Sequence, residues 1–475
     1  MNIKNDIASN VKKLKESLTS EDISFLELKC GESDAVIVFA NELVDKNAIG
    51  KLILEPATKI KGKFTAETAE KTFLSPEKEK INTITEVVDA VCQGETVIII
   101  DGINFAFSFG LKMFNQRAIS EPPTSTVIKG PREGFVENLP VNISLMRRRI
   151  KSNNLIFENI SVGKYSNTPV TICYVKGIAD QKLVNKVRKK LKKISIDAIL
   201  DSSYISKFLG EHKTAIFKQV GNTEKPDILA SKILEGRVAV FVDGSPIALT
   251  VPYLLIEDFQ SPSDYYSSPS NATISRCLRL ISVLISLLLP AFFVSAELFH
   301  LQFIPISFLL TIVNSIKGIP LSPSYEMFFT LLIFEILNEA SVRMPKYVGM
   351  VVSIVGGLVL GETAVTAGII SAPTLMIIAL SGICLYTVPE LEQTFSVIRL
   401  IFLVIAGSFG AYGIIITLGI LLVYLVSFET FNTPLFAPFA PLVKEDLKDT
   451  FYRGFIEENK YRPLSLRPKN KKRED

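Results

Sequence analysis

Four polar residues recur at helical spacing inside an apolar stretch of the sequence. Asn338, Glu339 and Arg343 follow Glu335 by three, four and eight positions, so one face of a helix would carry all four. Ionisable groups at membrane depth are costly and usually face water or a partner, so this face is a candidate wall of an ion path. The alternative is a Glu339–Arg343 pair that holds the helix to its neighbour.

A second acidic candidate lies further along the chain. Glu362 follows Gly356, Gly357 and Gly361, small residues that permit two helices to approach closely. Plain packing would need the same glycines. Because a ring of acidic groups requires several copies of the chain around an axis, an ion path built from these residues predicts a homo-oligomer.

The helices that must position these residues lie in the apolar half of the chain. Charges are frequent before about residue 275 and isolated between residues 278 and 428. Residues 278–296 carry no charge after Arg279, and as a helix they would extend about 28 Å, enough to cross the hydrocarbon core of a bilayer. Pro290 should kink this helix. We therefore predict an all-α polytopic transmembrane region over residues 271–430, in contact with membrane lipid.

The remaining apolar segments are less regular, and together they predict about four to six membrane segments. They are an interfacial or re-entrant piece at residues 301–320, a shorter helix at 325–342, two spans at 347–366 and 374–388, and a run of about 30 residues at 397–428.

Basic residues predict the orientation of these segments, because they favour the cytoplasmic side. Arg276 and Arg279 would precede the first span on that side, and Arg399 would belong to a cytoplasmic loop. A single long final helix would leave the basic tail, residues 431–475, outside. A break near one of three glycines (Gly407, Gly410 or Gly413) would return the tail to the cytoplasm, and we favour this arrangement.

The polar half contains one small unit twice. GETVIIIDGINFAF (residues 94–107) and GRVAVFVDGSPIAL (residues 236–249) each follow a stretch of helical period. The order is helix, strand, Asp-Gly and strand, and Asp-Gly predicts a two-residue type I′ turn. Two unrelated hairpins would give the same pattern. We favour two α/β subdomains, residues 30–130 and 131–270, after a polar segment at residues 1–29.

A basic triplet lies between the two copies. Residues 133–150 have helical periodicity and end in Arg147, Arg148 and Arg149. Arginines in the last turn favour the helix dipole and would also bind anionic partners or headgroups. A solvated helix end is the simpler interpretation.

Several classes of function are disfavoured. The net charge of +4 is too small to indicate nucleic-acid binding. Five scattered cysteines without a CxxC pair argue against a disulfide framework or a thiolate metal site. The chain shows no catalytic triad, H-E-x-x-H motif or glycine-rich phosphate loop. We therefore expect neither an enzyme nor a bound metal or cofactor.

Three longer motifs resemble successive signatures of the A subunit of GerA-type spore germination receptors. They are GPREGFVENLPVNISLMRRRIKSNNL from residue 130, QSPSDYY at 260–266 and FEILNEASVRMPKYVGMVVSIVGGLVLGETAVTAGIISAP at 334–373. The family-motif residues in the first are Pro131, Arg132, Glu133, Gly134 and Phe135, with Arg147, Arg148 and Arg149. The resemblance extends from about residue 90 to residue 460.

The resemblance implies a membrane subunit of a nutrient receptor that triggers spore germination. It would lie in the spore inner membrane or cell membrane, with its N-terminal domain cytoplasmic. Its implied partners are a transporter-like B subunit and a lipoprotein C subunit, and it would oligomerise into a cation-releasing channel that these partners gate. A non-conducting scaffold that couples a sensor to another channel, and a secondary transporter, remain alternatives.

Overall fold

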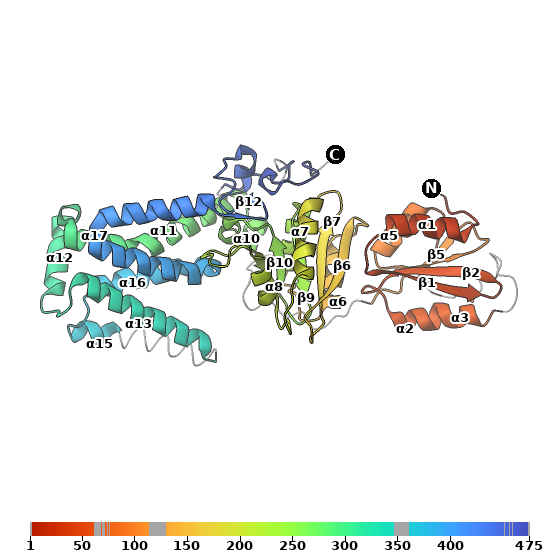
Figure 1. Ribbon diagram of the computed structural model, residues 1–475, viewed down its shortest axis with the longest axis horizontal. Helices are drawn as coiled ribbons and strands as arrows, with labels where there is room; N and C mark the ends of the chain where they lie inside the picture. The colour runs from red at the N-terminus through yellow and green to blue at the C-terminus, as the bar shows by residue number, and fades with distance from the viewer. Residues whose placement is uncertain are drawn as a thin grey trace. The chain divides into compact units, whose positions relative to one another are not determined.

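The computed structural model describes residues 2–60, 68, 72–73, 75, 77–113, 130–345, 361–450, 452–455, 457 and 459–473. The chain forms two compact units. The first comprises Met1–Tyr253, Thr430–Thr433 and Ile456–Asp475, and the second comprises Leu254–Glu429 and Pro434–Phe455. The first unit holds two five-stranded sheets, whereas long helices dominate the second (Figure 1).

The first sheet is antiparallel and has the strand order β1-β2-β4-β5-β3. Its strands are β1 (Ile23–Cys30), β2 (Ser33–Ala40), β3 (Lys78–Ile81), β4 (Thr96–Ile100) and β5 (Ala106–Phe109). Helices α1 (Ile7–Ser17) and α5 (Ile84–Cys92) pack on one face, and the short helices α2 (Lys46–Ile49) and α3 (Glu55–Thr58) pack on the other (Figure 1). Because both faces are covered, every residue of β4 is buried.

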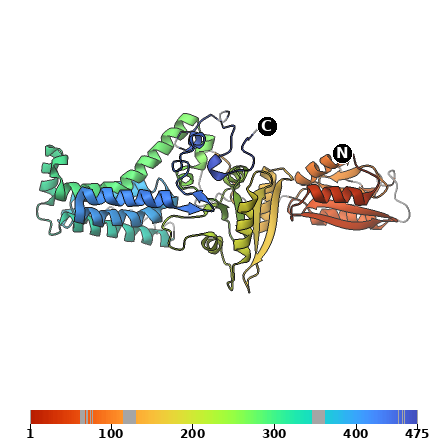
Figure 2. The same cartoon turned by 45° about the horizontal axis from the view of Figure 1, so that its top comes forward.

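The second sheet repeats this topology, with the order β6-β7-β9-β10-β8. Its strands are β6 (Leu155–Val162), β7 (Thr168–Val175), β8 (Gly221–Thr223), β9 (Val238–Val242) and β10 (Ala248–Val251). Helices α6 (Leu139–Arg149) and α9 (Pro226–Leu234) cover one face, and α7 (Gln181–Lys192) and α8 (Ser202–Leu209) cover the other (Figure 2). The repeated stretch of sequence is therefore a repeated fold rather than two unrelated hairpins.

The Asp-Gly turns differ from the type I′ prediction. Residues 101–105 and 243–247 connect the strands, so the turns are longer than two residues, and φ is positive at Gly102 and Gly244 but at neither aspartate. Asp101 Oδ1 accepts a hydrogen bond from the backbone N–H of Ile7 at 3.1 Å. The aspartate is needed at this position because a carboxylate is favourable beside the unpaired N–H groups that begin a helix.

The second subdomain makes the same turn-to-helix contact. Asp243 Oδ1 accepts from the N–H of Leu139 at 3.1 Å. Ile7 and Leu139 are the first residues of α1 and α6. In both subdomains, therefore, the turn between two central strands binds the start of the helix that precedes the sheet.

Two predicted segments are part of the folded subdomains. We predicted a separate polar segment over residues 1–29, but α1 and β1 belong to the first subdomain because Leu14 and Ile23 bury their apolar side chains in its core. The basic tail is not a separate segment either. Phe431 is 6% exposed in the core beneath α7, and the N–H of Lys469 donates to Ile178 O at 2.8 Å.

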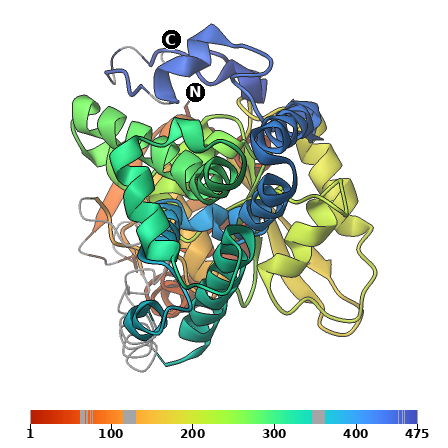
Figure 3. The same cartoon turned by 90° about the vertical axis from the view of Figure 1, so that its left-hand side faces the viewer.

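The second unit is a bundle of helices, seen end-on in Figure 3. Its helices are α10 (Pro262–Tyr266), α11 (Pro269–Phe299), α12 (Ile306–Ile316), α13 (Pro323–Arg343), α15 (Gly361–Thr366), α16 (Ala372–Leu385) and α17 (Glu392–Ser427). Among the described residues, two stretches are long and apolar enough to cross a membrane, Pro269–Phe299 and Pro389–Ser427. Most of the span predicted at residues 347–366 falls outside the described residues.

The last apolar run contains the break that the sequence allowed. Gly410 has φ 62° and ψ −147° inside α17, so the α-helical backbone is interrupted there. The two segments on either side of Gly410 lie side by side (Figure 1). Of the three candidate glycines, only Gly410 has positive φ.

Candidate functional site

The predicted site residue Glu335 lies opposite a buried arginine. Arg399, on α17, is 1% exposed, and its Nη2 lies 2.5 Å from Glu335 Oε1 on α13. Arg399 Nη1 donates to Ser381 Oγ on α16 at 2.7 Å, and Ser381 Oγ donates to Ser286 O on α11 at 2.8 Å. One guanidinium group therefore links four helices of the bundle.

Asn338 extends this arrangement by one helical turn. Its Nδ2 donates to Glu392 Oε1 at 2.6 Å, and its Oδ1 accepts from Tyr386 Oη at 2.8 Å. Glu392 begins α17 and Tyr386 follows α16. We name this set the charged layer; it consists of Glu335, Asn338, Ser381, Tyr386, Glu392 and Arg399.

The structure leaves the other predicted residues outside the charged layer. Glu339 and Arg343 form a pair at 2.5 Å one helical turn apart, with side chains 63% and 78% exposed. Such an exposed pair is worth at most about 1 kcal/mol, so it does not hold α13 to a neighbour. Glu362 is exposed on α15.

Sequence reasoning missed Arg399, which was predicted in a cytoplasmic loop. It lies within α17, and the Phe334 ring is 5.9 Å from its Cζ. Because a charge removed from water needs a compensating partner, an arginine in this position requires the carboxylate of Glu335. The only signal in the sequence was a lone arginine before a long apolar run.

A second buried acid was also missed. Glu326, in the first turn of α13, is 1% exposed. Its Oε1 accepts from both the N–H and the Oγ of Ser371, at 2.7 Å each. Ser371 caps the N-terminus of α16, a position where a carboxylate is favourable. Helix α13 therefore binds α16 near its beginning and α17 near its middle through carboxylates.

The arginine triplet has a structural role that the sequence did not predict. Arg147 is 1% exposed, and its Nε and Nη2 donate to the two carboxylate oxygens of Asp22 at 2.8 and 2.7 Å. Asp22 precedes β1, so this bidentate pair joins the two subdomains. Burial acts to lower the pKa of Arg147, but its hydrogen bonds with Asp22 outweigh burial and raise the pKa. The prediction of a solvated helix end was wrong for Arg147.

The other family-motif residues support the same helix from outside the core. Arg149 and Arg148 lie 2.8 and 3.8 Å from the carboxylate of Glu133. Lys225 holds the segment before α6, because its Nζ donates a hydrogen bond to Pro131 O at 2.8 Å. Of the remaining three, Phe135 packs edge-on against Phe241 with ring centroids 5.3 Å apart, Gly134 is buried, and Arg132 is exposed.

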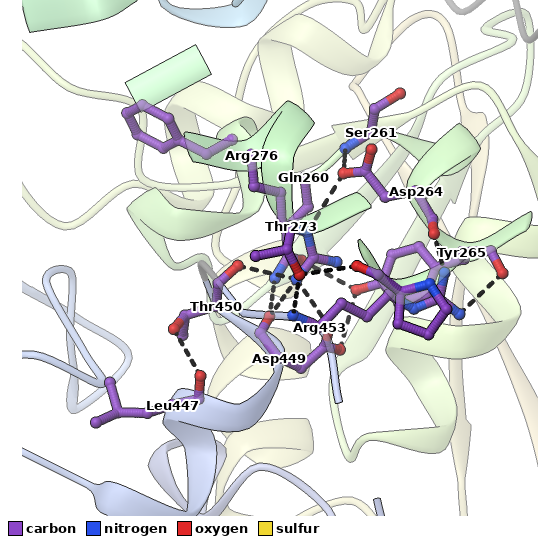
Figure 4. A network of polar contacts seen from close by, with 12 residues as sticks. Gln260, Ser261, Asp264, Tyr265, Thr273, Arg276, Leu447, Asp449, Thr450 and Arg453 are labelled. Carbon is purple, nitrogen blue, oxygen red and sulfur yellow. Dashed lines mark hydrogen bonds and ion pairs between the residues drawn. The ribbon is translucent and has the colours of Figure 1, made fainter. Parts of the chain in front are cut away.

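Three arginines gather where α11 begins, in what we name the arginine clamp, and Figure 4 shows two of them, Arg276 and Arg453. It consists of Arg276, Arg279 and Arg453 with Asp264 and Asp449. Arg276 is 0% exposed and contacts Asp264 at 3.3 Å and Asp449 at 3.0 Å. Arg453 donates to the backbone carbonyls of Asp264 and Tyr265. The QSPSDYY motif therefore binds the chain that follows α17 to the start of α11.

The Asp264 carboxylate is the centre of this clamp. Arg279 Nη1 and Nη2 bind its two oxygens at 2.7 and 2.6 Å. Burial would raise the pKa of Asp264, but the hydrogen bonds from Arg279 and from the N–H of Ser261 hold it below its ordinary value. The carboxylate is therefore ionised at any physiological pH.

Four of the five cysteine thiols are buried. All five cysteines are free, and burial raises the pKa of Cys30 and of Cys92 to about 11. Among the described residues, no group of three or more His, Cys, Asp or Glu side chains could hold a metal ion.

Fold and site together define a protein of two α/β subdomains and a helical unit with apolar helices around a charged layer. A family model described as Bacillus/Clostridium GerA spore germination protein matches residues 9–465. Spore germination protein KA of Bacillus subtilis (strain 168) is 35% identical over 478 residues, which cover 98% of this chain and 88% of that protein. The uncharacterized membrane protein YfkQ of the same organism is 35% identical over 374 residues, covering 78% of this chain and 73% of YfkQ.

A solved structure also matches. The crystal structure of the N-terminal domain of the A subunit of the Bacillus megaterium spore germinant receptor GerK3 is 29% identical. The match covers 54% of this chain and 98% of the GerK3 domain, with a TM-score of 0.42. The family match and the relatives show that this chain belongs to the GerA family of spore germination proteins. This family is not a known class of enzyme.

Proposed function

We propose that this protein is the A-type subunit of a nutrient receptor that starts spore germination, and that it forms a homo-oligomeric ion channel. The charged layer carries this proposal. Ionisable side chains among apolar helices commonly mark ion paths or switches, since their cost must be balanced by a function. Membership of the GerA family supports the receptor role, and the two long apolar helices support a place in a membrane.

The proposed setting is the spore inner membrane or cell membrane. The helical unit crosses it several times, and the two α/β subdomains lie on the cytoplasmic side. A transporter-like B subunit binds the nutrient, and a lipoprotein C subunit completes the receptor. These partners gate the channel.

In this proposal the charged layer is the gate. With Glu335 and Arg399 paired, α13 is held against α17 and the two charges neutralise each other. A signal from the partner subunits that separates the two helices would break the pair. Glu335 would then offer a free carboxylate to a cation, and Arg399 would lose its compensating charge.

Replacement of Glu335 tests this mechanism. We expect Glu335→Gln to change ion release, because it removes both the pair with Arg399 and the carboxylate that would be offered to a cation. Ion release from spores and the abundance of the subunit would both be measured. Glu339→Gln is the matched control, since it removes the same charge from the exposed side of α13. Unchanged ion release in Glu335→Gln spores with normal subunit abundance would remove the charged layer from the path.

One observation favours a second function, that of a non-conducting subunit which couples a sensor to another channel. Glu335 pairs with Arg399, and Glu339 pairs with Arg343, as in a purely structural arrangement. Reconstitution of this subunit alone in liposomes separates the two functions. A channel would give a cation leak that Glu335→Gln alters, whereas a scaffold would leave the liposomes tight.

A further inference from the structure

Helix α8 of the second subdomain carries apolar side chains on two faces. Its inward face buries Ile205 and Leu209 in the core beneath α7. Its outward face carries Tyr204 and Phe208, four positions apart and 41% and 42% exposed, and Leu200 just before the helix is 70% exposed. We name these three outward residues the α8 stripe. A helix that is apolar all round is normally covered all round, yet among the described residues none covers the stripe.

The charges around the stripe are mostly basic. From the end of α7 to residue 213, the exposed charged residues are Lys192, Lys193, Asp197, Lys207 and Lys213. The other two acids of this stretch are engaged within the protein, because the carboxylate of Asp201 caps α8 and that of Glu211 pairs with Lys186 at 2.5 Å. The open apolar face is therefore bordered by lysines, and it fits an anionic surface.

The end of α8 is tied to the chain that leaves the last apolar helix. Glu211, two residues after α8, accepts a hydrogen bond from the N–H of Phe431 at 3.1 Å. Phe431 follows Ser427, the last residue of α17, by four positions, and an extended chain of that length spans at most about 14 Å. This limit comes from the covalent chain, so it holds for any arrangement of the two units.

Aromatic rings mark the same end of α17. Tyr424 and Phe428 have ring centroids 5.4 Å apart. Tyrosines at the end of an apolar helix commonly lie at the membrane–water interface. In the membrane setting proposed above, this end of α17 lies at the membrane surface, and the tie through Phe431 keeps α8 within reach of that surface.

We propose that the α8 stripe inserts into the surface of an anionic phospholipid bilayer, with its lysines at the phosphate groups. This inference rests on the proposed membrane setting of the helical unit. Tyrosine and lysine suit such a position, because each has an apolar body that enters the bilayer and a polar end that stays at the headgroups. The inserted stripe would hold the second subdomain against the membrane.

A second copy of the chain fits the stripe less well. In a symmetric contact the same residues of two copies face one another, so Lys207 and Lys213 would meet their counterparts. Like charges brought together in this way are unfavourable, whereas the phosphates of an anionic bilayer attract both lysines.

A single introduced tryptophan tests the proposal, because the chain contains none of its own. The full-length protein with Phe208→Trp would be placed in nanodiscs of phosphatidylcholine and phosphatidylglycerol, with and without bromine on the acyl chains. We expect bromine to quench the fluorescence about twofold or more, because an interfacial helix buries its apolar face at the boundary of headgroups and acyl chains.

Two matched variants make the result specific. Leu234 is 41% exposed on α9, which covers the opposite face of the same sheet, so bromine should not quench Leu234→Trp. Val423 is 70% exposed on α17, so bromine should quench Val423→Trp if the helical unit lies in lipid.

The role of charge is tested by Lys207→Gln in the Phe208→Trp protein. We expect the ratio of inserted to free α8 to fall about fivefold, the effect of removing one lysine from an anionic surface. In nanodiscs of phosphatidylcholine alone, Lys207→Gln should leave this ratio unchanged. An equal fall in both kinds of nanodisc would overturn the assignment of the lysines to anionic headgroups.

The outcomes separate this inference from the proposed function. Quenching of Val423→Trp without quenching of Phe208→Trp would overturn the inference and leave the membrane setting intact. Quenching of neither variant would overturn both. A blue-shifted emission from Phe208→Trp that bromine does not quench would also overturn the inference, since protein, such as a second copy, would then cover the stripe.

Discussion

The two α/β subdomains share a strand order and a turn-to-helix contact, yet they differ in what covers their edges. In the second, β6 is covered by residues 20–22, and the core beneath α7 is completed by Phe431. Among the described residues of the first, β1 has no equivalent cover. The comparison shows that the contacts that build each fold are the same in both copies, whereas the contacts at the sheet edges differ.

Replacement of Arg147 should produce the largest difference in stability between the two subdomains. Arg147→Ala leaves Asp22 buried without its partner, so we expect the second subdomain to lose about 3–5 kcal/mol of stability. Lys15→Ala, at the equivalent position, is exposed and should change stability by about 0.5 kcal/mol or less. Hydrogen exchange of β1 and β6 in the full-length protein would measure both. Equal losses of stability from the two substitutions would contradict the conclusion that Arg147 joins the two subdomains.

The turn aspartates test what the subdomains have in common. Asp101→Ala and Asp243→Ala each remove one hydrogen bond to a helix N-terminus, so each should cost about 1 kcal/mol. The effect should appear as faster exchange in α1 for the first and in α6 for the second. Asn at either position keeps an acceptor and should restore most of the loss. A much larger cost at one position would show that the contact is not equivalent in the two copies.

The smallest expected effect depends on pH and belongs to the second subdomain alone. Glu211 accepts from the N–H of Phe431 and pairs with Lys186. Burial would raise the pKa of Glu211, but its hydrogen bonds with Lys186 and Phe431 lower it below the ordinary 4.5. A lowered pKa stabilises the folded state fully above pH 4.5, and this stabilisation is lost as pH falls through the folded value.

Protection of the Phe431 amide against exchange, corrected for intrinsic rates, should therefore be constant from pH 7 to about pH 5 and fall below pH 4.5. Glu211→Gln should reduce this protection at neutral pH and remove its dependence on acid. Protection that begins to fall above pH 6 in wild type would rule out Glu211 as the titrating group.

The sequence predicted the helices and strands better than the turns that connect them. The apolar run of β4 and the preceding helical period predicted helix, strand, turn and strand, because these patterns are local. The turn type was wrong because Asp101 binds Ile7, which is remote in sequence. Gly410 could not be chosen over Gly407 or Gly413, since each glycine offers the same backbone freedom.

The site was predicted only in part for a similar reason. Helical spacing put Glu335 and Asn338 on the same side of α13, and both belong to the charged layer. The same spacing could not separate them from Glu339, which is exposed. Arg399, the partner of Glu335, is 64 residues away from it, and no periodicity links the two. Buried ion pairs between helices depend on the tertiary packing, which a single sequence does not display.

The place of Phe431 limits how the chain can be threaded through a bilayer. This residue follows the last long helix, yet its ring is buried among side chains of α7 and the sheet beneath it. A chain that leaves one compartment from residue 253 and inserts a residue into the same domain afterwards must return to the side where it started. Gly410, where α17 folds back on itself, supplies such a return, since residues 430–433 belong to the same compact unit as residues 1–253.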